Sequence, residues 1–130
     1  MNWTKTWKAS VKPSKQRKYV RNAPAHVRSK LPVSHLSKDL KQKHKSRSLR
    51  VIKGDKVKVT RGQYKNKTGT VDRVDTKRMK VFITGIDFAK RDGSKSMYPI
   101  HPSNLLIQEL NTNDKLRLGG EKKTVKGEKK

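Results

Sequence analysis

Three basic side chains and an aromatic ring lie close together in the segment 61–67. Arg61, Lys65 and Lys67 carry positive charges that neutralise phosphates. Tyr64 offers a ring that can either stack on an exposed nucleotide base or pack over a neighbouring strand. A residue without Cβ permits a positive φ or the close approach of another backbone, and we expect such structural roles at Gly54, Gly62 and Gly69. The segment is typical of a loop that binds a polyanion.

More basic side chains gather in the first 50 residues, which hold 15 Lys and Arg against 1 acid, and in one later turn. Such side chains suit contacts with phosphates across junctions between RNA helices. The candidates outside the segment 61–67 are Lys15, Arg17, Lys18, Arg21, Arg28, Lys30, Arg47, Arg50, Lys77 and Arg78. We expect them to hold distant RNA segments together.

The whole chain of 130 residues carries a formal net charge of +25, and only 30% of it is hydrophobic. A chain with this charge repels itself unless it binds a polyanion. A basic run is most often a solvated face, but that interpretation is weak where acidic residues are so scarce. The low hydrophobic content also limits the packed core to roughly half of the chain.

The sequence does not support other kinds of site. It has no cysteine, which excludes disulfides and zinc ribbons, and its four histidines lack the spacing of metal ligands. It contains no phosphate-cradling glycine-rich motif and no nucleophile with an identifiable base. No apolar run approaches the roughly 20 residues of a membrane span, and the first residues lack the apolar core of a secretory signal. We therefore expect no catalysis, cofactor, metal, small-molecule substrate or membrane anchor.

The elements that must position the basic residues are of two kinds. Residues 13–21, 25–30 and 38–44 are expected to form short helices, with Pro13 at the start of the first and Ser37 as the N-cap of the third. From residue 49 the pattern changes to strands, because Val57 and Val59 alternate with polar residues. Five short strands are expected, at 56–61, 68–74, 79–84, 97–100 and 105–110, and they fit a small, strongly bent barrel.

This pattern divides the chain into three parts. Residues 1–48 form a basic N-terminal extension with short helices, 49–110 a mainly β domain with the barrel, and 111–130 a polar, flexible C-terminal tail. The helices are too short to be stable alone, so we expect them to order on binding and residues 1–45 to be dispensable for folding of the barrel. Trp3 and Trp7 stand one helical turn apart, which fits stacking on RNA, docking on a neighbouring protein or a local cluster.

Within the β domain, the segment 52–74 resembles a KOW motif, the small SH3-like barrel unit of ribosomal proteins and transcription elongation factors. The matching residues are Gly54, Asp55, Val57, Val59, Gly62, Gly69 and Val71. The chain also resembles the family of the universal ribosomal large-subunit protein twenty-four, in its archaeal and eukaryotic form. Four further stretches carry this closer resemblance: Arg17–Pro24, Leu36–Leu40, Arg47–Arg50 and Tyr98–Asn104.

The resemblance implies an RNA-binding structural protein of the large ribosomal subunit. The family implies a cytoplasmic location near the exit of the polypeptide tunnel, an early place in subunit assembly, and as partners large-subunit ribosomal RNA and neighbouring ribosomal proteins. The long basic front argues for the archaeal or eukaryotic branch, and the short C-terminal part favours an archaeal source. Two other classes stay open, a KOW-type transcription elongation factor and an architectural protein that bends duplex DNA.

Overall fold

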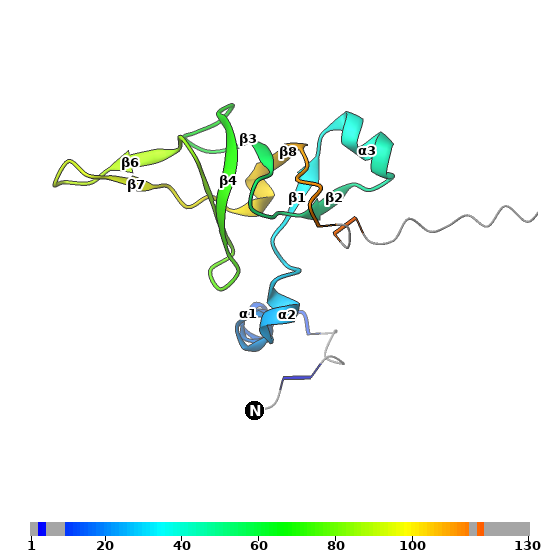
Figure 1. Cartoon of the computed structure of the whole chain (residues 1–130). Coiled ribbons are helices and arrows are strands. Elements are labelled where there is room, and N and C mark those ends of the chain that lie inside the picture. The colour runs from blue at the N-terminus through cyan, green and yellow to red at the C-terminus, as the bar shows by residue number, and fades with distance from the viewer. Residues whose placement is uncertain (1–2, 5–9, 115–116, 119–130) are drawn as a thin grey trace, which may run out of the picture.

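The computed structural model describes residues 3–4, 10–114 and 117–118, and most of its elements are strands (Figure 1). A six-stranded sheet has the order β2-β1-β8-β3-β4-β5, and β6 and β7 form a separate two-stranded hairpin. The large sheet consists of β1 (Val33–Leu36), β2 (Ser48–Arg50), β3 (Lys56–Val59), β4 (Thr68–Asp75), β5 (Lys80–Ile83) and β8 (Leu105–Glu109). The hairpin consists of β6 (Asp87–Ala89) and β7 (Lys95–Met97). The prediction of a mainly β protein is confirmed.

Four of the five expected strands are present, as β3, β4, β5 and β8. The sequence predicts another strand at 97–100, but β7 ends at Met97 and pairs with β6. Ile100 adds only an isolated bridge to Val81. Pro99 has no N–H to donate, which prevents a longer ladder at this point. The described part of the chain therefore contains eight strands instead of five.

The hydrophobic core follows the period-two alternation of the strands. Val57 and Val59 of β3 are 0% and 1% exposed, whereas Lys56 is exposed. β8 lies between β1 and β3 and pairs with both, so its buried residues join the two halves of the sheet. The core consists of Leu36, Val51, Val57, Val59, Val71, Val81, Ile83, Ile86, Ile100, Leu105 and Ile107.

β1 comes from the segment that the sequence assigns to the basic extension. It pairs in parallel with β8, with Leu36 opposite Ile107, and Leu36 is 1% exposed. Ser34 Oγ donates a 2.6 Å hydrogen bond to the carbonyl of Pro102 in the 3₁₀ helix η1 (Pro102–Asn104). Deleting residues 1–45 would remove Leu36 from the core and uncover an edge of β8, while folding of the β domain without them stays a prediction. The four residues of β1 are too few to show a period in the sequence.

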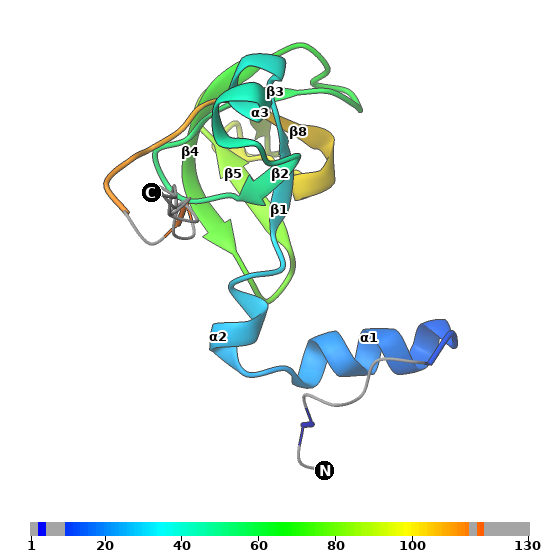
Figure 2. The same ribbon diagram turned by 90° about the vertical axis from the view of Figure 1, so that its right-hand side faces the viewer.

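Three short helices lie at or near their predicted positions. α1 (Pro13–Asn22) begins with proline, and α3 (Lys38–His44) is capped by Ser37, whose Oγ accepts a 3.4 Å hydrogen bond from the N–H of Leu40. α2 (Ala25–Arg28) is shorter than predicted. α1 and α2 lie beyond one end of the sheet (Figure 2), and neither helix has a buried residue. In the described part of the chain, no helix is long and apolar enough to cross a membrane.

The predicted turn glycines meet different steric requirements. Gly62 has a φ of +95° and Gly54 a φ of +89°, a left-handed conformation that residues with a Cβ rarely adopt. Gly69 lies in β4, where a Cβ would come within 2.5 Å of the carbonyl oxygen of Thr84. All three glycines therefore serve the backbone, two as turn residues and one by allowing a close approach.

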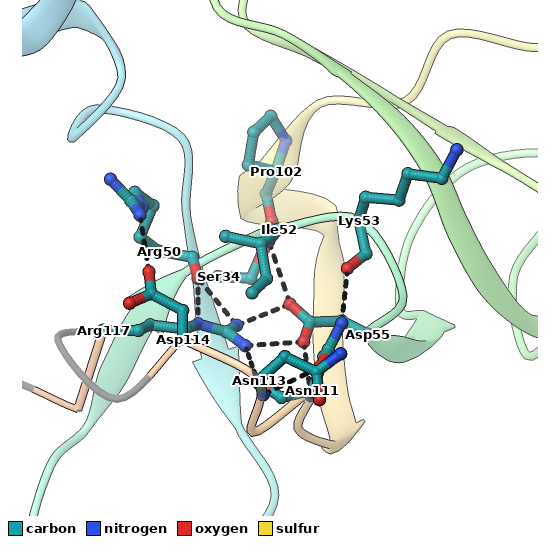
Figure 3. A network of polar contacts seen from close by, with 10 residues as sticks. All are labelled: Ser34, Arg50, Ile52, Lys53, Asp55, Pro102, Asn111, Asn113, Asp114 and Arg117. Atoms are coloured by element: carbon teal, nitrogen blue, oxygen red, sulfur yellow. Dashed lines mark hydrogen bonds and ion pairs between the residues drawn. The ribbon is translucent and has the colours of Figure 1, made fainter.

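A buried ion pair attaches the C-terminal segment to the start of β3 (Figure 3). The Asp55 carboxylate accepts 3.0 Å hydrogen bonds from the N–H groups of Ile52 and Asn111. The guanidinium of Arg117 donates to both carboxylate oxygens of Asp55 and to the carbonyl of Arg50. The two side chains of the pair are almost completely buried, with 0% of Asp55 and 1% of Arg117 exposed.

The described residues between 111 and 118 are thus docked on the β domain, where the sequence predicts a flexible tail. Asn111 Nδ2 also donates to the carbonyl of Lys53 at 3.0 Å, and Asp114 pairs with Arg50 at 3.5 Å. The polar composition of this segment does not indicate docking, because the segment is held by a buried carboxylate elsewhere in the chain. A buried charge requires hydrogen-bond donors and a counter-charge. The remainder of the predicted tail, 119–130, lies outside the described residues.

Replacing Arg117 with methionine should strongly destabilise the protein. Removing one partner of a buried ion pair leaves an uncompensated charge, and we expect Arg117→Met to lower the free energy of unfolding by about 3 kcal/mol. Urea denaturation followed by circular dichroism measures the change. The matched control Arg91→Met removes an exposed arginine and should change the stability by less than about 0.5 kcal/mol. Equal stability of the two variants would contradict the role of the ion pair.

Candidate nucleic-acid interface

Helix α1 presents basic residues on a solvated surface. Arg17 and Arg21 are four positions apart, so they lie on the same face of the helix. Pro13 presets the helical φ at the first position, where its missing N–H costs nothing. Because no residue of α1 is buried, the helix is held by its neighbours only loosely and keeps its charged side chains available.

The turn between β4 and β5 is held in one conformation by Asp75. The Oδ1 atom of Asp75 accepts hydrogen bonds from the N–H groups of Lys77 and Arg78, at 2.9 and 3.1 Å. Met79 completes the turn with a φ of +55°, so the strand predicted from Met79 begins one residue later, at Lys80. The carboxylate thereby presents two exposed cations on a fixed turn.

The two helices and this turn form a cleft with a strongly basic lining, called here the basic cleft. Its lining residues are Gln16, Arg17, Val20, Arg21, Arg28, Lys77 and Arg78. Five of these seven residues carry a positive charge, and none of the described residues that line the cleft is acidic. The fold therefore brings together five of the predicted phosphate-binding residues from two distant parts of the sequence.

One arginine of the basic cleft has a buried nitrogen without a partner. Nothing among the described residues accepts a hydrogen bond from Arg28 Nε. A buried donor without an acceptor costs about 1–3 kcal/mol, and the repulsion among five cations adds to that cost. An anion in the cleft would offset the repulsion and offer acceptors to the guanidinium groups. The cleft thus has the chemistry of a phosphate-binding site.

The loop 60–67 carries a second group of cations. Arg61, Lys65 and Lys67 are all exposed. Backbone hydrogen bonds close the loop, because the N–H of Asn66 donates to the carbonyl of Val59 and the N–H of Val59 donates to the carbonyl of Lys67, each at 2.8 Å. The three cations therefore stand on a preformed loop, which lowers the entropy cost of binding.

Tyr64 packs on the protein. Its hydroxyl donates a 3.0 Å hydrogen bond to the carbonyl of Asp87, and its ring centroid lies 4.9 Å from that of Tyr98. The ring is half-buried against the core, and Lys67 Nζ lies 5.1 Å from its centroid. Of the two interpretations left open by the sequence, packing is observed, and stacking on a base stays a prediction.

The loop 60–67 and the β4–β5 turn, which contributes Lys77 and Arg78 to the basic cleft, lie at opposite ends of β4 (Figure 1). The loop precedes Thr68, and the turn that contributes to the cleft follows Asp75. A strand of eight residues spans about 25 Å. The two groups of cations are therefore too far apart to share one phosphate, and they suit separate segments of a folded nucleic acid.

The other predicted phosphate-binding residues lie outside these two groups. They are Lys15, Lys18, Lys30, Arg47 and Arg50. Lys18 lines a groove on α1 that adjoins the basic cleft, since Arg17 and Arg21 line both. Arg50 lines a different groove, where Asp114 already pairs with it at 3.5 Å. Arg50 is thus the predicted residue whose charge is most clearly used within the protein.

Two residues that line the basic cleft are not among those predicted from the sequence. Gln16 and Val20 line the cleft because they are four positions apart and so lie on one face of α1. The ring of Trp3 lies 5.1 Å from that of Tyr19 on α1, which matches the local-cluster interpretation for this tryptophan. Trp7 lies outside the described residues.

Comparison with known proteins gives two findings. The profile of the family described as "Ribosomal proteins L26 eukaryotic, L24P archaeal" matches residues 10–119. A curated relative, "Large ribosomal subunit protein uL24" of Methanospirillum hungatei, is 46% identical over 108 residues, which cover 83% of this chain and 90% of the relative. The range matched by the profile includes the basic cleft, the loop 60–67 and Arg117.

Neutralising the basic cleft should weaken RNA binding more than an equal loss of charge elsewhere. The triple variant Arg17→Gln, Arg21→Gln and Arg28→Gln removes three cleft cations, and the matched control Lys38→Gln, Lys41→Gln and Lys43→Gln removes three from α3. Each lost phosphate contact should reduce the slope of log affinity against log salt by about 0.7–0.9. Filter binding of a structured ribosomal RNA fragment over a salt series measures both slopes, and identical slopes for the two variants would show that only net charge matters.

Proposed function

The chain belongs to the family of L26 eukaryotic and L24P archaeal ribosomal proteins, and from this premise we propose that it binds ribosomal RNA as a structural protein of the large subunit. The resemblance of the sequence to the archaeal and eukaryotic form is confirmed by the family match and by the archaeal relative. RNA binding at the residues named above goes beyond the family match and rests on the charge and geometry of this chain.

The basic cleft is the observation that carries the proposal. Five cations from α1, α2 and the β4–β5 turn line one hollow, without an acidic residue among the described lining. A protein that folds alone rarely concentrates like charges in this way, because the repulsion destabilises it. RNA supplies phosphates at regular spacing, and it is abundant in the large subunit.

The proposed mechanism is a two-ended grip on the RNA backbone. RNA helices have a deep, narrow major groove that side chains cannot read, so a protein of this kind contacts phosphates, 2′-hydroxyl groups and unstacked loops. The basic cleft would hold one segment and Arg61, Lys65 and Lys67 another, about 25 Å away at the other end of β4. Binding releases counterions from both segments, which makes the affinity dependent on salt.

The resemblance to the family suggests finer assignments, which we also propose. The protein would lie near the exit of the polypeptide tunnel, act early in subunit assembly and contact neighbouring ribosomal proteins in the cytoplasm. An early role suits a two-ended grip, since holding two RNA segments at a fixed distance is most useful before other contacts hold them.

We further propose that β3, β4, β5 and β8 form the SH3-like barrel of a KOW motif. The register shifts between Lys56 and Val57 and between Val71 and Arg73, and such bulges bend a sheet. The isolated bridge between Val81 and Ile100 adds a further connection beside β5. These irregularities favour a closed, strongly bent sheet and argue against a flat one.

Sedimentation of a native cell extract through a sucrose gradient in moderately high salt tests the proposed function. We expect mass spectrometry to find the protein in the large-subunit fractions at stoichiometric amount, because moderate salt removes weak adventitious contacts before it dissociates an assembled interface with many contacts. Recovery of the protein at the top of the gradient would contradict the proposal. Recovery with RNA polymerase would favour a transcription elongation factor, and recovery with chromatin would favour an architectural DNA-binding protein.

A further inference from the structure

The β6–β7 hairpin projects from the large sheet (Figure 1), and neither of its strands belongs to that sheet. Every residue of β6 is exposed, and so are Lys95 and Met97 of β7. A two-stranded hairpin without a covered face is marginally stable in water. The hairpin therefore has a surface that a partner could cover.

The tip of this hairpin is well ordered by local hydrogen bonds. The N–H and Oγ of Ser94 donate to Asp92 Oδ1 at 3.0 and 2.7 Å, and the N–H of Lys90 donates to the carbonyl of Ser94 at 2.8 Å. The hydrogen bonds from Ser94 hold the pKa of Asp92 below its ordinary value. Gly93 completes the turn with a φ of +81°. The hairpin is thus preformed, and little ordering is needed when it binds.

Three aromatic rings form a continuous strip from the base of the hairpin along β6. The rings of Tyr64 and Tyr98 lie 4.9 Å apart, and the rings of Tyr98 and Phe88 lie 6.3 Å apart at an angle of 89°. Phe88 is 41% exposed and Tyr98 is 37% exposed. The aromatic strip (Tyr64, Tyr98 and Phe88) therefore exposes part of its ring surface to solvent.

Exposed lysines lie near the aromatic strip. Lys67 Nζ is 5.1 Å from the centroid of Tyr64. Lys90 is exposed and directly follows β6, two residues after Phe88. Aromatic rings flanked by cations are the combination with which proteins bind single-stranded nucleic acid, because bases stack on the rings and phosphates pair with the cations.

We propose that the aromatic strip binds unpaired bases of RNA by stacking, chiefly on Phe88. This inference rests on the proposed function and deepens it, since it assigns the strip to single-stranded RNA and the basic cleft to backbone phosphates. Charge favours RNA over a protein partner, because Lys67 and the exposed Lys90 lie near the strip on a chain with a net charge of +25. The hairpin would thus read an exposed loop or bulge of the RNA, where bases are free to stack.

The experiment compares the full-length protein with Phe88→Leu and Phe88→Trp, using a single-stranded oligoadenylate and a blunt-ended, perfectly paired RNA duplex as probes at raised salt. Leucine keeps the apolar surface but removes the π face. We expect Phe88→Leu to weaken binding of the oligoadenylate by about fivefold or more and to leave binding of the paired duplex unchanged, whereas Phe88→Trp retains binding. The matched control Val33→Ala alters another exposed apolar residue, at 37% exposure, and should change neither affinity.

Wild-type affinity of Phe88→Leu for oligoadenylate, or an equal loss on both probes, would overturn the proposal. Circular dichroism of each variant establishes that it is folded. Ultraviolet crosslinking in isolated large subunits provides the second measurement. An RNA adduct on the peptide that contains Phe88 supports the proposal, and contact of that peptide with protein alone overturns it. Failure of the proposed function would give a different result from failure of this inference. In that case the protein would be missing from the large-subunit fractions of the gradient, whatever its affinity for the oligonucleotides.

Discussion

The buried carboxylate of Asp55 is the constraint on which the arrangement of the β domain depends. It is completely inaccessible to solvent, so it must be compensated within the protein, and Ile52, Asn111 and Arg117 supply the donors. Ile52 belongs to the loop before β3, and Asn111 and Arg117 belong to the C-terminal segment that follows β8. β3 and β8 are neighbours in the sheet, so the ion pair anchors the C-terminal segment where β8 joins β1 and β2 to β3, β4 and β5.

The sheet in turn places positive charge at both ends of β4, where none of these cations forms a salt bridge with a described residue. β4 carries the loop 60–67 at one end and the turn with Lys77 and Arg78 at the other. Asp75 is the acid closest to that turn in the sequence, and its Oδ1 accepts the backbone N–H groups of both cations. Asp55, Asp75 and Asp92 accept hydrogen bonds from backbone N–H groups, and the excess of cations is available for the proposed contacts with RNA. We infer from this distribution that the β domain works as a spacer between two phosphate-binding regions.

Local signals in the sequence predicted the local structure well. The alternation at Val57 and Val59 and the cap at Ser37 each depend on a few adjacent residues, and both were found. Other features join residues that are about 50 or more positions apart in the sequence. They are the pairing of β1 with β8, the ion pair of Asp55 with Arg117 and the convergence of α1 with the β4–β5 turn. Charge and polarity in one sequence contain no information on such pairs. The individual cations of the site were predictable, but the cleft that five of them share was not.

The claim that two ends of one β domain hold separate RNA segments is tested most directly by tethered hydroxyl-radical cleavage in assembled large subunits. The chain has no cysteine, so the single variants Gln16→Cys at the basic cleft and Gln63→Cys in the loop 60–67 each give one attachment point for an iron chelate. If the two ends of the β domain hold separate RNA segments, we expect two sets of cleaved nucleotides that do not overlap and that belong to different segments of the ribosomal RNA. Cleavage of the same nucleotides from both positions, or no cleavage from one of them, would contradict it.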